Sequence, residues 1–167
     1  LTEFAANYDI TMLFSDALAN RDFVDLVGPE RFAAFEHEGT APSFTGPEAG
    51  YFADSYEAAY GAPPGAFLSN AYDAMMLLTL ALHASEEPTG IAIRDHLAEV
   101  SSGGTPYGAR DLPELLDAIG RGEDVDYVGA SGEVDLDPFG DVVAPYDIWQ
   151  VDDVGVVVVE QAVLPTR

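Results

Sequence analysis

The longest apolar stretch of the chain, residues 66–82, carries hydrophobic or small side chains at nearly every position. A helix that is apolar on all sides is a buried helix, so this pattern predicts a core helix over residues 66–84. The stretch is slightly short for a bilayer and is interrupted by Asn70 and Asp73, which argues against a membrane span. Two prolines and a glycine at 63–65 predict a sharp turn into the helix.

Before this core helix, the pattern predicts one strand and two further helices. The apolar run 10–14 has the length of a strand. Asn20 is a favourable N-cap for a helix that Gly28 ends, and Pro47 opens a helix that ends at Gly61. The remaining expectations in this half of the chain are the end of a helix at 1–8, either a turn of helix or the approach to a strand at 32–35, and a segment at 38–42 that leads into a loop.

After the core helix, the pattern changes from helices to strands near Val125. Thr89 caps a predicted helix that ends before Gly103, and a second helix is expected from 112 to about 119. Alternating strands and helices followed by a strand-rich tail predict an α/β fold with open sheets flanked by helices. The predicted strands are 125–129, 132–137, 145–151 and 155–163, with a hairpin turn at 152–155.

The chain is strongly acidic. Its 167 residues include 30 Asp and Glu but only six Arg and no Lys, which gives a net charge of −24. Such a surface repels nucleic acids and anionic membranes, so we expect neither as a partner. The composition fits either a high-salt habitat, where salt screens the self-repulsion, or a bias toward Arg codons. The absence of cysteine excludes disulfides and thiolate metal sites.

No motif for enzymatic chemistry is present. The sequence contains no G-x-S-x-G, H-E-x-x-H or P-loop pattern. His37, His83 and His96 lack the spacing of metal ligands. We therefore expect no enzymatic activity, no cofactor and no metal. The segment 135–141 has the alternating carboxylates of a short calcium loop, but a turn in which Asp137 bonds its own backbone needs no ion, and we favour the turn.

Asp16 is the most informative single carboxylate. It follows the predicted strand 10–14, and ligands of open α/β sheets bind beyond the carboxyl ends of strands. A carboxylate at that place can accept charge-assisted hydrogen bonds from a ligand ammonium group. The alternative, which position alone favours, is an Asp that only forms the turn.

Three stretches together resemble one family, the type I periplasmic solute-binding proteins that serve ABC importers for branched-chain amino acids and amides. AFLSNAYDAMMLLTLAL resembles the helix after that family's second inter-lobe crossing. YVGASGEVDLDPFGDVVAPYDIWQV resembles its C-terminal G-x-S/T-G, F-D-x-x-G-D and Y-x-I-W-x-V pattern, with Leu136 in place of the usual aromatic. MLFSDALANRDFVDLVG, followed by EGTAPS, resembles a strand and a helix of its second lobe.

The resemblance implies a two-lobed α/β fold with three crossings and a ligand in the cleft, of which this chain is a C-terminal portion. On that map, residues 1–62 belong to lobe two, 63–130 to lobe one, and 131–167 return to lobe two. Roughly the first half of the protein would then lie outside this sequence, including groups that usually hold the ligand carboxylate. That missing half, or a homodimer partner in its absence, is therefore an expected partner.

The same resemblance implies the binding residues. Relatives that bind amino acids carry an acidic residue at the place of Asp16, where it holds the ligand ammonium. Asn70 and Tyr72 lie near the second crossing and are weaker candidates to face the cleft. For Tyr72, a core aromatic is the favoured interpretation.

The function implied is an extracytoplasmic solute-binding subunit of an ABC importer, binding an amino acid or related small polar ligand. Its partners would be the ligand and the importer's membrane subunits. The alternative is the ligand-sensing domain of a transmembrane receptor, which can use the same fold. The two would differ in whether a transmembrane helix follows the domain.

Overall fold

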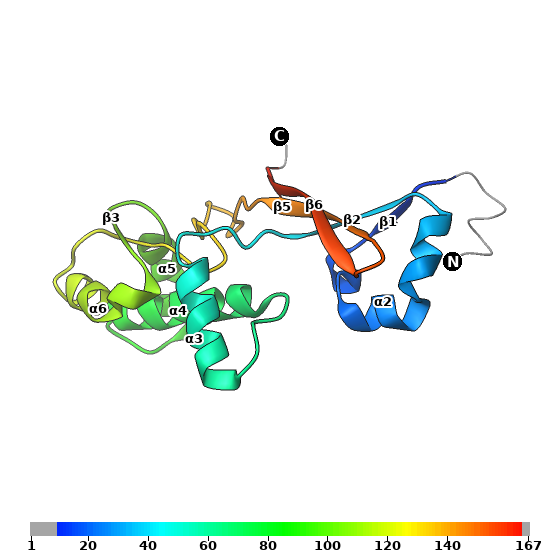
Figure 1. Ribbon diagram of the computed structural model, residues 1–167. Coiled ribbons are helices and arrows are strands. Elements are labelled where there is room, and N and C mark those ends of the chain that lie inside the picture. Colours follow the sequence, from blue (N-terminus) through cyan, green and yellow to red (C-terminus); the bar gives the residue numbers. More distant parts are fainter. Residues whose placement is uncertain (1–9, 165–167) are drawn as a thin grey trace. The chain divides into compact units, whose positions relative to one another are not determined.

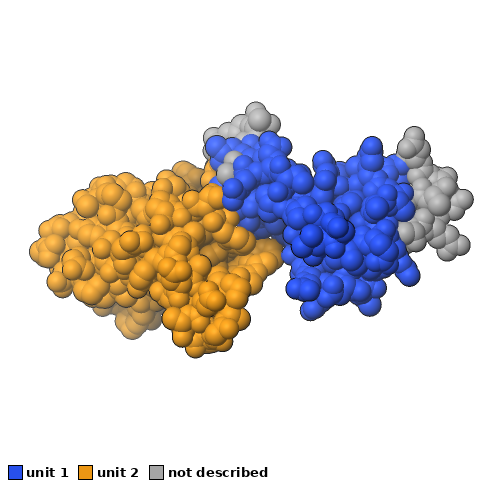
Figure 2. Space-filling view, viewed as in Figure 1, with its two compact units in different colours: residues 1–43, 145–167 blue, residues 44–144 orange. Residues whose placement is uncertain are grey.

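The computed structural model describes residues 10–164, which divide into two compact units (Figures 1 and 2). Unit 1 contains the residues up to 43 and those from 145 onward, and unit 2 contains residues 44–144. The chain therefore passes between the units at 43/44 and 144/145. The sequence expectation placed the lobe changes at 62/63 and 130/131. The assignment of these units to lobes of a larger protein stays a prediction, and the expected helix end at 1–8 lies outside the described residues.

Unit 1 is built on a four-stranded mixed sheet with the order β1-β2-β5-β6. β1 (Met12–Phe14) is parallel to β2 (His37–Pro42), whereas β5 (Tyr146–Val151) is antiparallel to both β2 and β6 (Val156–Val163). The predicted strands at 10–14, 145–151 and 155–163 are thus confirmed, as is the hairpin turn between the last two.

Residues 38–42, which were expected only to lead into a loop, form most of β2. Its sequence, HEGTAP, has no apolar alternation, so its strand character comes from pairing on both sides. Gly39 lies opposite Trp149, and a Cβ added at Gly39 would overlap the indole ring. Only glycine lets the strand backbone pass this close to the ring.

The core of unit 1 is aromatic. Trp149 is 1% exposed and stacks on Phe14 with ring centroids 5.9 Å apart, and Phe32 is fully buried beside them. The predicted helix is confirmed as α2 (Arg21–Val27), whose first turn is capped by Asn20 accepting a hydrogen bond from Phe23 N–H at 2.8 Å. Two 3₁₀ helices, η1 (Asp16–Leu18) and η2 (Pro29–Ala34), complete the unit.

The cap at Asn20 gives a first testable expectation. Asn20→Ala should lower the free energy of unfolding by about 1 kcal/mol, because Phe23 N–H loses its acceptor at the helix start. Chemical denaturation followed by Trp149 fluorescence measures the effect, since this buried indole reports on unit 1. Asn20→Ser, which retains a capping oxygen, is the matched control and should restore most of the loss. Equal destabilisation by both substitutions would contradict the capping role.

Unit 2 consists of four helices around a two-stranded parallel sheet. The helices are α3 (Ala49–Tyr60), α4 (Leu68–Ala84), α5 (Gly90–Ser101) and α6 (Leu112–Gly120). The strands are β3 (Thr105–Tyr107) and β4 (Val125–Tyr127), and the 3₁₀ helix η3 (Ala109–Asp111) follows β3. The core contains Leu80, Leu115 and Tyr127, which are fully buried.

The helices of unit 2 begin close to the predicted positions, but two strand assignments differ. β3 was not predicted, because its TPY sequence is short and contains a proline. The predicted strand 132–137 is not formed. Its single ladder contact is the bridge between Val128 and Glu133, and Leu136 N–H instead donates to Ser101 Oγ at 3.2 Å. The favoured turn at Asp137 is present, since its Oδ1 accepts hydrogen bonds from the N–H groups of Phe139 and Asp141.

Within this chain, α4 is buried along one face only, so the prediction of a helix covered on all sides depends on polypeptide outside the described residues and stays a prediction. One face, including Met76, Leu77 and Leu80, packs into the core against α5 and α6. The opposite face forms an exposed apolar stripe, defined by Phe67, Met75, Leu78 and Leu82, in which Met75 is 64% exposed. Unit 2 offers packing partners to only one face of this helix.

Candidate functional site

Asp16 lies where the sequence predicted it, just beyond the end of β1 in unit 1. It is half-buried in η1, and its Oδ1 accepts a hydrogen bond from Ala17 N–H at 2.7 Å. The carboxylate therefore stabilises its own turn, as the alternative interpretation held. One backbone bond leaves a carboxylate with further lone pairs, so the turn and a ligand contact are compatible.

Asn70 and Tyr72 belong to unit 2, in the first two turns of α4. Among the described residues, no hydrogen-bond partner is found for the buried Oδ1 of Asn70. Tyr72 is half-buried, and its ring centroid lies 5.1 Å from that of Phe52 in α3. Burial, and then the nearby hydroxyl of Tyr51 and carboxylate of Asp73, raise the pKa of Tyr72. This packing agrees with the favoured interpretation of Tyr72 as a core aromatic, while a binding role for either residue stays a prediction.

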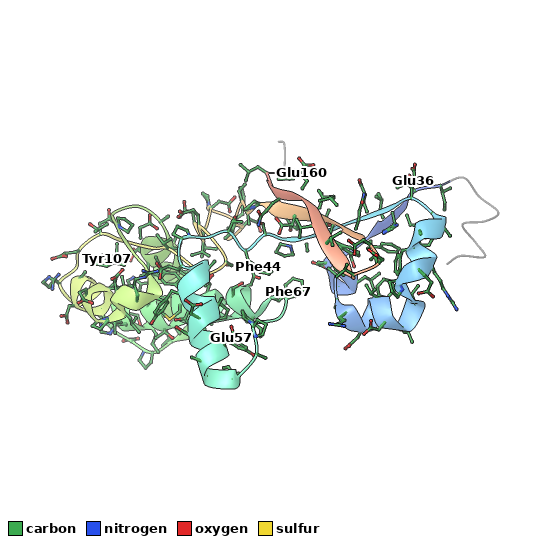
Figure 3. The ribbon with its side chains drawn as sticks, viewed as in Figure 1. Glu36, Phe44, Glu57, Phe67, Tyr107 and Glu160 are labelled. Atoms are coloured by element: carbon green, nitrogen blue, oxygen red, sulfur yellow. The ribbon has the colours of Figure 1, made fainter. Side chains whose placement is uncertain are left out.

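Phe67, which the sequence analysis did not select for a binding role, has an unusual backbone. Its φ is +66°, in the left-handed region, and its ring is 40% exposed at the start of α4 (Figure 3). An aromatic residue in this region costs of order 1–3 kcal/mol, and such strain is concentrated at functional sites. Sequence alone carries no signal for it, because glycine and not phenylalanine is the residue type that readily takes a positive φ.

Asp73 is the second residue that sequence reasoning passed over. It is 2% exposed, and its carboxylate accepts four hydrogen bonds. The donors are Tyr127 Oη at 3.0 Å, Ala130 N–H at 2.9 Å, and the N–H and hydroxyl of Ser131 at 2.7 and 2.6 Å. The available signal was a single carboxylate within an otherwise apolar helix, because a buried charge requires partners.

A second buried carboxylate, Glu48, lies at the entry to α3. It is 8% exposed, and its Oε1 lies 3.1 Å from Nε of Arg110. The guanidinium of Arg110 also lies over the ring of Tyr51, 5.3 Å from the centroid. The hydrogen bond to Glu48 raises the pKa of Arg110. The pair links the start of α3 to η3.

A surface cavity of about 560 Å³ lies in unit 1, between η2 and the N-terminal end of β2, and Asp16 does not line it. His37 forms part of its wall with both ring nitrogens engaged. Nδ1 lies 3.1 Å from Phe35 O, and Nε2 accepts a hydrogen bond from Val151 N–H at 2.9 Å. The ring therefore links β2 to β5. Among residues 10–164, no group of three or more His, Asp or Glu side chains is arranged to hold a metal ion.

The fold of this chain is similar to that of solved amino-acid binding proteins. The chain superposes over 96% of its length on a leucine binding protein, LivK, from Thermotoga maritima, with a TM-score of 0.65 and 18% identity. It superposes over 97% of its length on the branched-chain amino acid transporter substrate binding protein LivJ from Streptococcus pneumoniae, in complex with isoleucine, with a TM-score of 0.64 and 19% identity. In each case this chain spans 39% of the solved protein.

A relative found by sequence is also named as a substrate-binding protein. The chemotactic signal transduction system substrate-binding protein BasB from Halobacterium salinarum is 37% identical over 91 residues, which are 54% of this chain and 22% of that protein. No protein-family model matches the chain. None of the helices in the described part of the chain has the length and apolar content needed to cross a membrane.

These proteins are named for binding solutes and not for enzymatic activity, in agreement with the expectation of a non-enzymatic chain. The α/β units, the mixed sheet of unit 1 and the partial coverage all agree with the predicted fold class. The chain therefore has the type I periplasmic-binding-protein fold of the branched-chain amino acid binding proteins, of which it corresponds to a portion.

Proposed function

We propose that this chain is part of an extracytoplasmic solute-binding subunit of an ABC importer, which encloses an amino acid or related small polar ligand between two lobes. The observation that carries the proposal is the superposition of nearly the whole chain on leucine and branched-chain amino acid binding proteins. Binding without chemistry also suits the side chains described above, which offer aromatic rings, an amide and carboxylates. Closure of two lobes about a hinge would trap the ligand.

In this proposal the two units contribute different contacts. Asp16 of unit 1 would accept hydrogen bonds from the ligand ammonium, which a carboxylate does best. In unit 2, the ring of Phe67, whose backbone is left-handed, would cover the apolar part of the ligand, and Asn70 and Tyr72 would supply polar groups from the same end of α4. Since this chain spans 39% of the solved proteins, the remaining contacts would come from polypeptide beyond these residues.

A second candidate function is ligand delivery to a signalling system. It is supported by the curated relative, whose name assigns it to chemotactic signal transduction. This candidate differs from a receptor domain followed by a transmembrane helix, because that relative is named as a substrate-binding protein. Co-purification of the intact gene product with importer subunits or with a chemotaxis transducer separates the two.

The binding role of Asp16 is tested by Asp16→Asn in the full-length protein. The substitution should weaken binding of the best amino-acid ligand by about 1.5–3 kcal/mol, because a charge-assisted hydrogen bond is replaced by a neutral one. Isothermal titration calorimetry with a panel of amino acids measures the loss.

Asp22→Asn is the matched control, since Asp22 is an exposed carboxylate of α2 in the same unit. The affinity of Asp22→Asn for the best amino-acid ligand should equal that of the unmodified protein within experimental error. Unchanged affinity in Asp16→Asn would remove this role from Asp16. A best ligand that is a neutral amide or an anion would also contradict it.

A further inference from the structure

The chain changes unit twice, and we call residues 44–46 the incoming passage and residues 133–144 the outgoing passage. Both passages start or end at one turn in unit 2. Residues 129–132, the GASG turn, are closed by a hydrogen bond from Gly129 N–H to Gly132 O at 3.0 Å. The incoming passage lies directly against this turn. A Cβ added at Gly46 would be 2.7 Å from both Cα and N of Gly132, and 3.0 Å from the carbonyl oxygen of Gly129. The backbones therefore touch without intervening side chains.

The outgoing passage begins at the same turn, and its first residues are held by backbone interactions. Its anchors all belong to unit 2, since Glu133 bridges to Val128, and Leu136 N–H donates to Ser101 Oγ. On the unit 1 side, Ser43 N–H donates to Pro145 O at 3.0 Å, which pairs the two passages again. Between these anchors the chain is exposed, at 44–45 and 138–143.

Asp73 is the group that fixes the turn to the body of unit 2. Three of its four hydrogen bonds come from Ala130 and Ser131 of the turn, and the fourth comes from Tyr127 at the end of β4. A Cβ added at Gly129 would be 2.5 Å from Asp73 Oδ2, so the turn backbone closes directly over the carboxylate. The carboxylate stands on α4, whose neighbouring turns carry the core residues Met76, Leu77 and Leu80.

We propose that Asp73 is a positioning residue for the junction between the units, holding the GASG turn on α4 so that both passages leave unit 2 from a fixed base. Loss of the hydrogen bonds to Asp73 would release the base of both passages within unit 2. This role requires no ligand, so its test is separate from that of Asp16.

The test uses Asp73→Asn in the 167-residue chain. The amide cannot serve four donors, because its nitrogen would face a backbone N–H of the turn. Since the chain has no cysteine, Leu26→Cys in unit 1 and Ile91→Cys in unit 2 give two specific spin-label sites at exposed side chains. Labelled chain is diluted into excess unlabelled chain, so that only distances within one molecule are measured. Tyr127→Phe is the matched control, since it removes one hydrogen bond to the same carboxylate and leaves the three from the turn.

In Asp73→Asn, the label–label distance distribution should broaden, and amide hydrogen exchange at residues 130 and 131 should accelerate by about tenfold or more. In Tyr127→Phe, both should stay close to those of the unmodified chain. An unchanged distribution in Asp73→Asn would overturn the proposal, whatever the exchange rate in the turn. Equal broadening in Tyr127→Phe would also overturn it, because it would indicate general loosening of unit 2. If Asp73→Asn does not fold, Gly129→Ala replaces it, because the added Cβ would lie 2.5 Å from Asp73 Oδ2 and force the turn away from the carboxylate; an unchanged distance distribution in that variant would overturn the proposal.

Discussion

The isolated 167-residue chain is expected to associate with itself through the exposed apolar stripe of α4. Met75, Leu78 and Leu82 recur at helical spacing along one side of α4, and the exposed Phe67 lies at the N-terminal cap of the same helix. At about 25 cal/mol per Å², leaving several hundred Å² of such surface in water costs on the order of 10 kcal/mol, comparable to the stability of a domain. A homodimer would cover this face, as would polypeptide beyond these residues in the intact protein.

Sedimentation equilibrium measures this association directly. The unmodified chain should sediment as a dimer or larger species at micromolar concentration, and the double variant Met75→Ser with Leu78→Ser should shift it toward monomer. Ile91→Ser with Val154→Ser is the matched control, because both residues are exposed and apolar but lie outside the stripe. A folded, cooperatively unfolding monomer of the unmodified chain would contradict the prediction.

Salt should stabilise the folded chain strongly. A net charge of −24 on 167 residues repels itself most in the compact state. Raising the ionic strength from 0.1 M to 1 M shortens the Debye length from about 10 Å to about 3 Å, which removes most repulsion between exposed charges. We expect the thermal unfolding midpoint to rise by roughly 10 °C or more over this range in NaCl, corresponding to a few kcal/mol.

Asp126 allows the effect of charge repulsion on stability to be tested at a single residue. Burial, and then repulsion from Asp135, Glu133 and Asp124, raise the pKa of Asp126. A raised pKa in the folded state means that the ionised carboxylate destabilises the fold, so this residue's contribution favours folding at acidic pH and is lost as pH rises through the folded-state pKa. Asp126→Asn should therefore increase stability at pH 7 and reduce its dependence on salt, whereas the exposed Asp54→Asn should change neither.

These effects are read by differential scanning calorimetry at 0.1, 0.5 and 1 M NaCl. Parallel runs in sucrose of matched viscosity separate screening from general exclusion of cosolvents, because sucrose does not screen charge. An unfolding midpoint that does not change with NaCl would show that the acidic surface carries no net repulsive cost. A decrease in stability for Asp126→Asn at pH 7 would contradict the local argument.

Local sequence signals determined the parts of this protein whose structure depends on nearby residues. Asn20 and Thr89 cap helices through bonds to N–H groups three residues ahead, and Gly61 ends α3 in a left-handed conformation. The hairpin at 152–155 depends on Asp152, whose Oδ1 accepts from the N–H groups of Val154 and Gly155. Each is a short-range interaction that the residue types themselves specify, and the family resemblance added the fold class that the superpositions support.

Tertiary structure alone decided the rest, because the deciding partners are distant in the chain. β2 is a strand because β1 and β5 pair with it, although HEGTAP carries no strand pattern. The segment 132–137 is not a strand, since Ser101 takes the N–H of Leu136. Asp73 acquires its role only when Tyr127 and the turn at 129–132, both distant in the sequence, close around its carboxylate. The strain at Phe67 likewise exists only in the folded backbone, and no pattern of hydrophobic and polar residues encodes it.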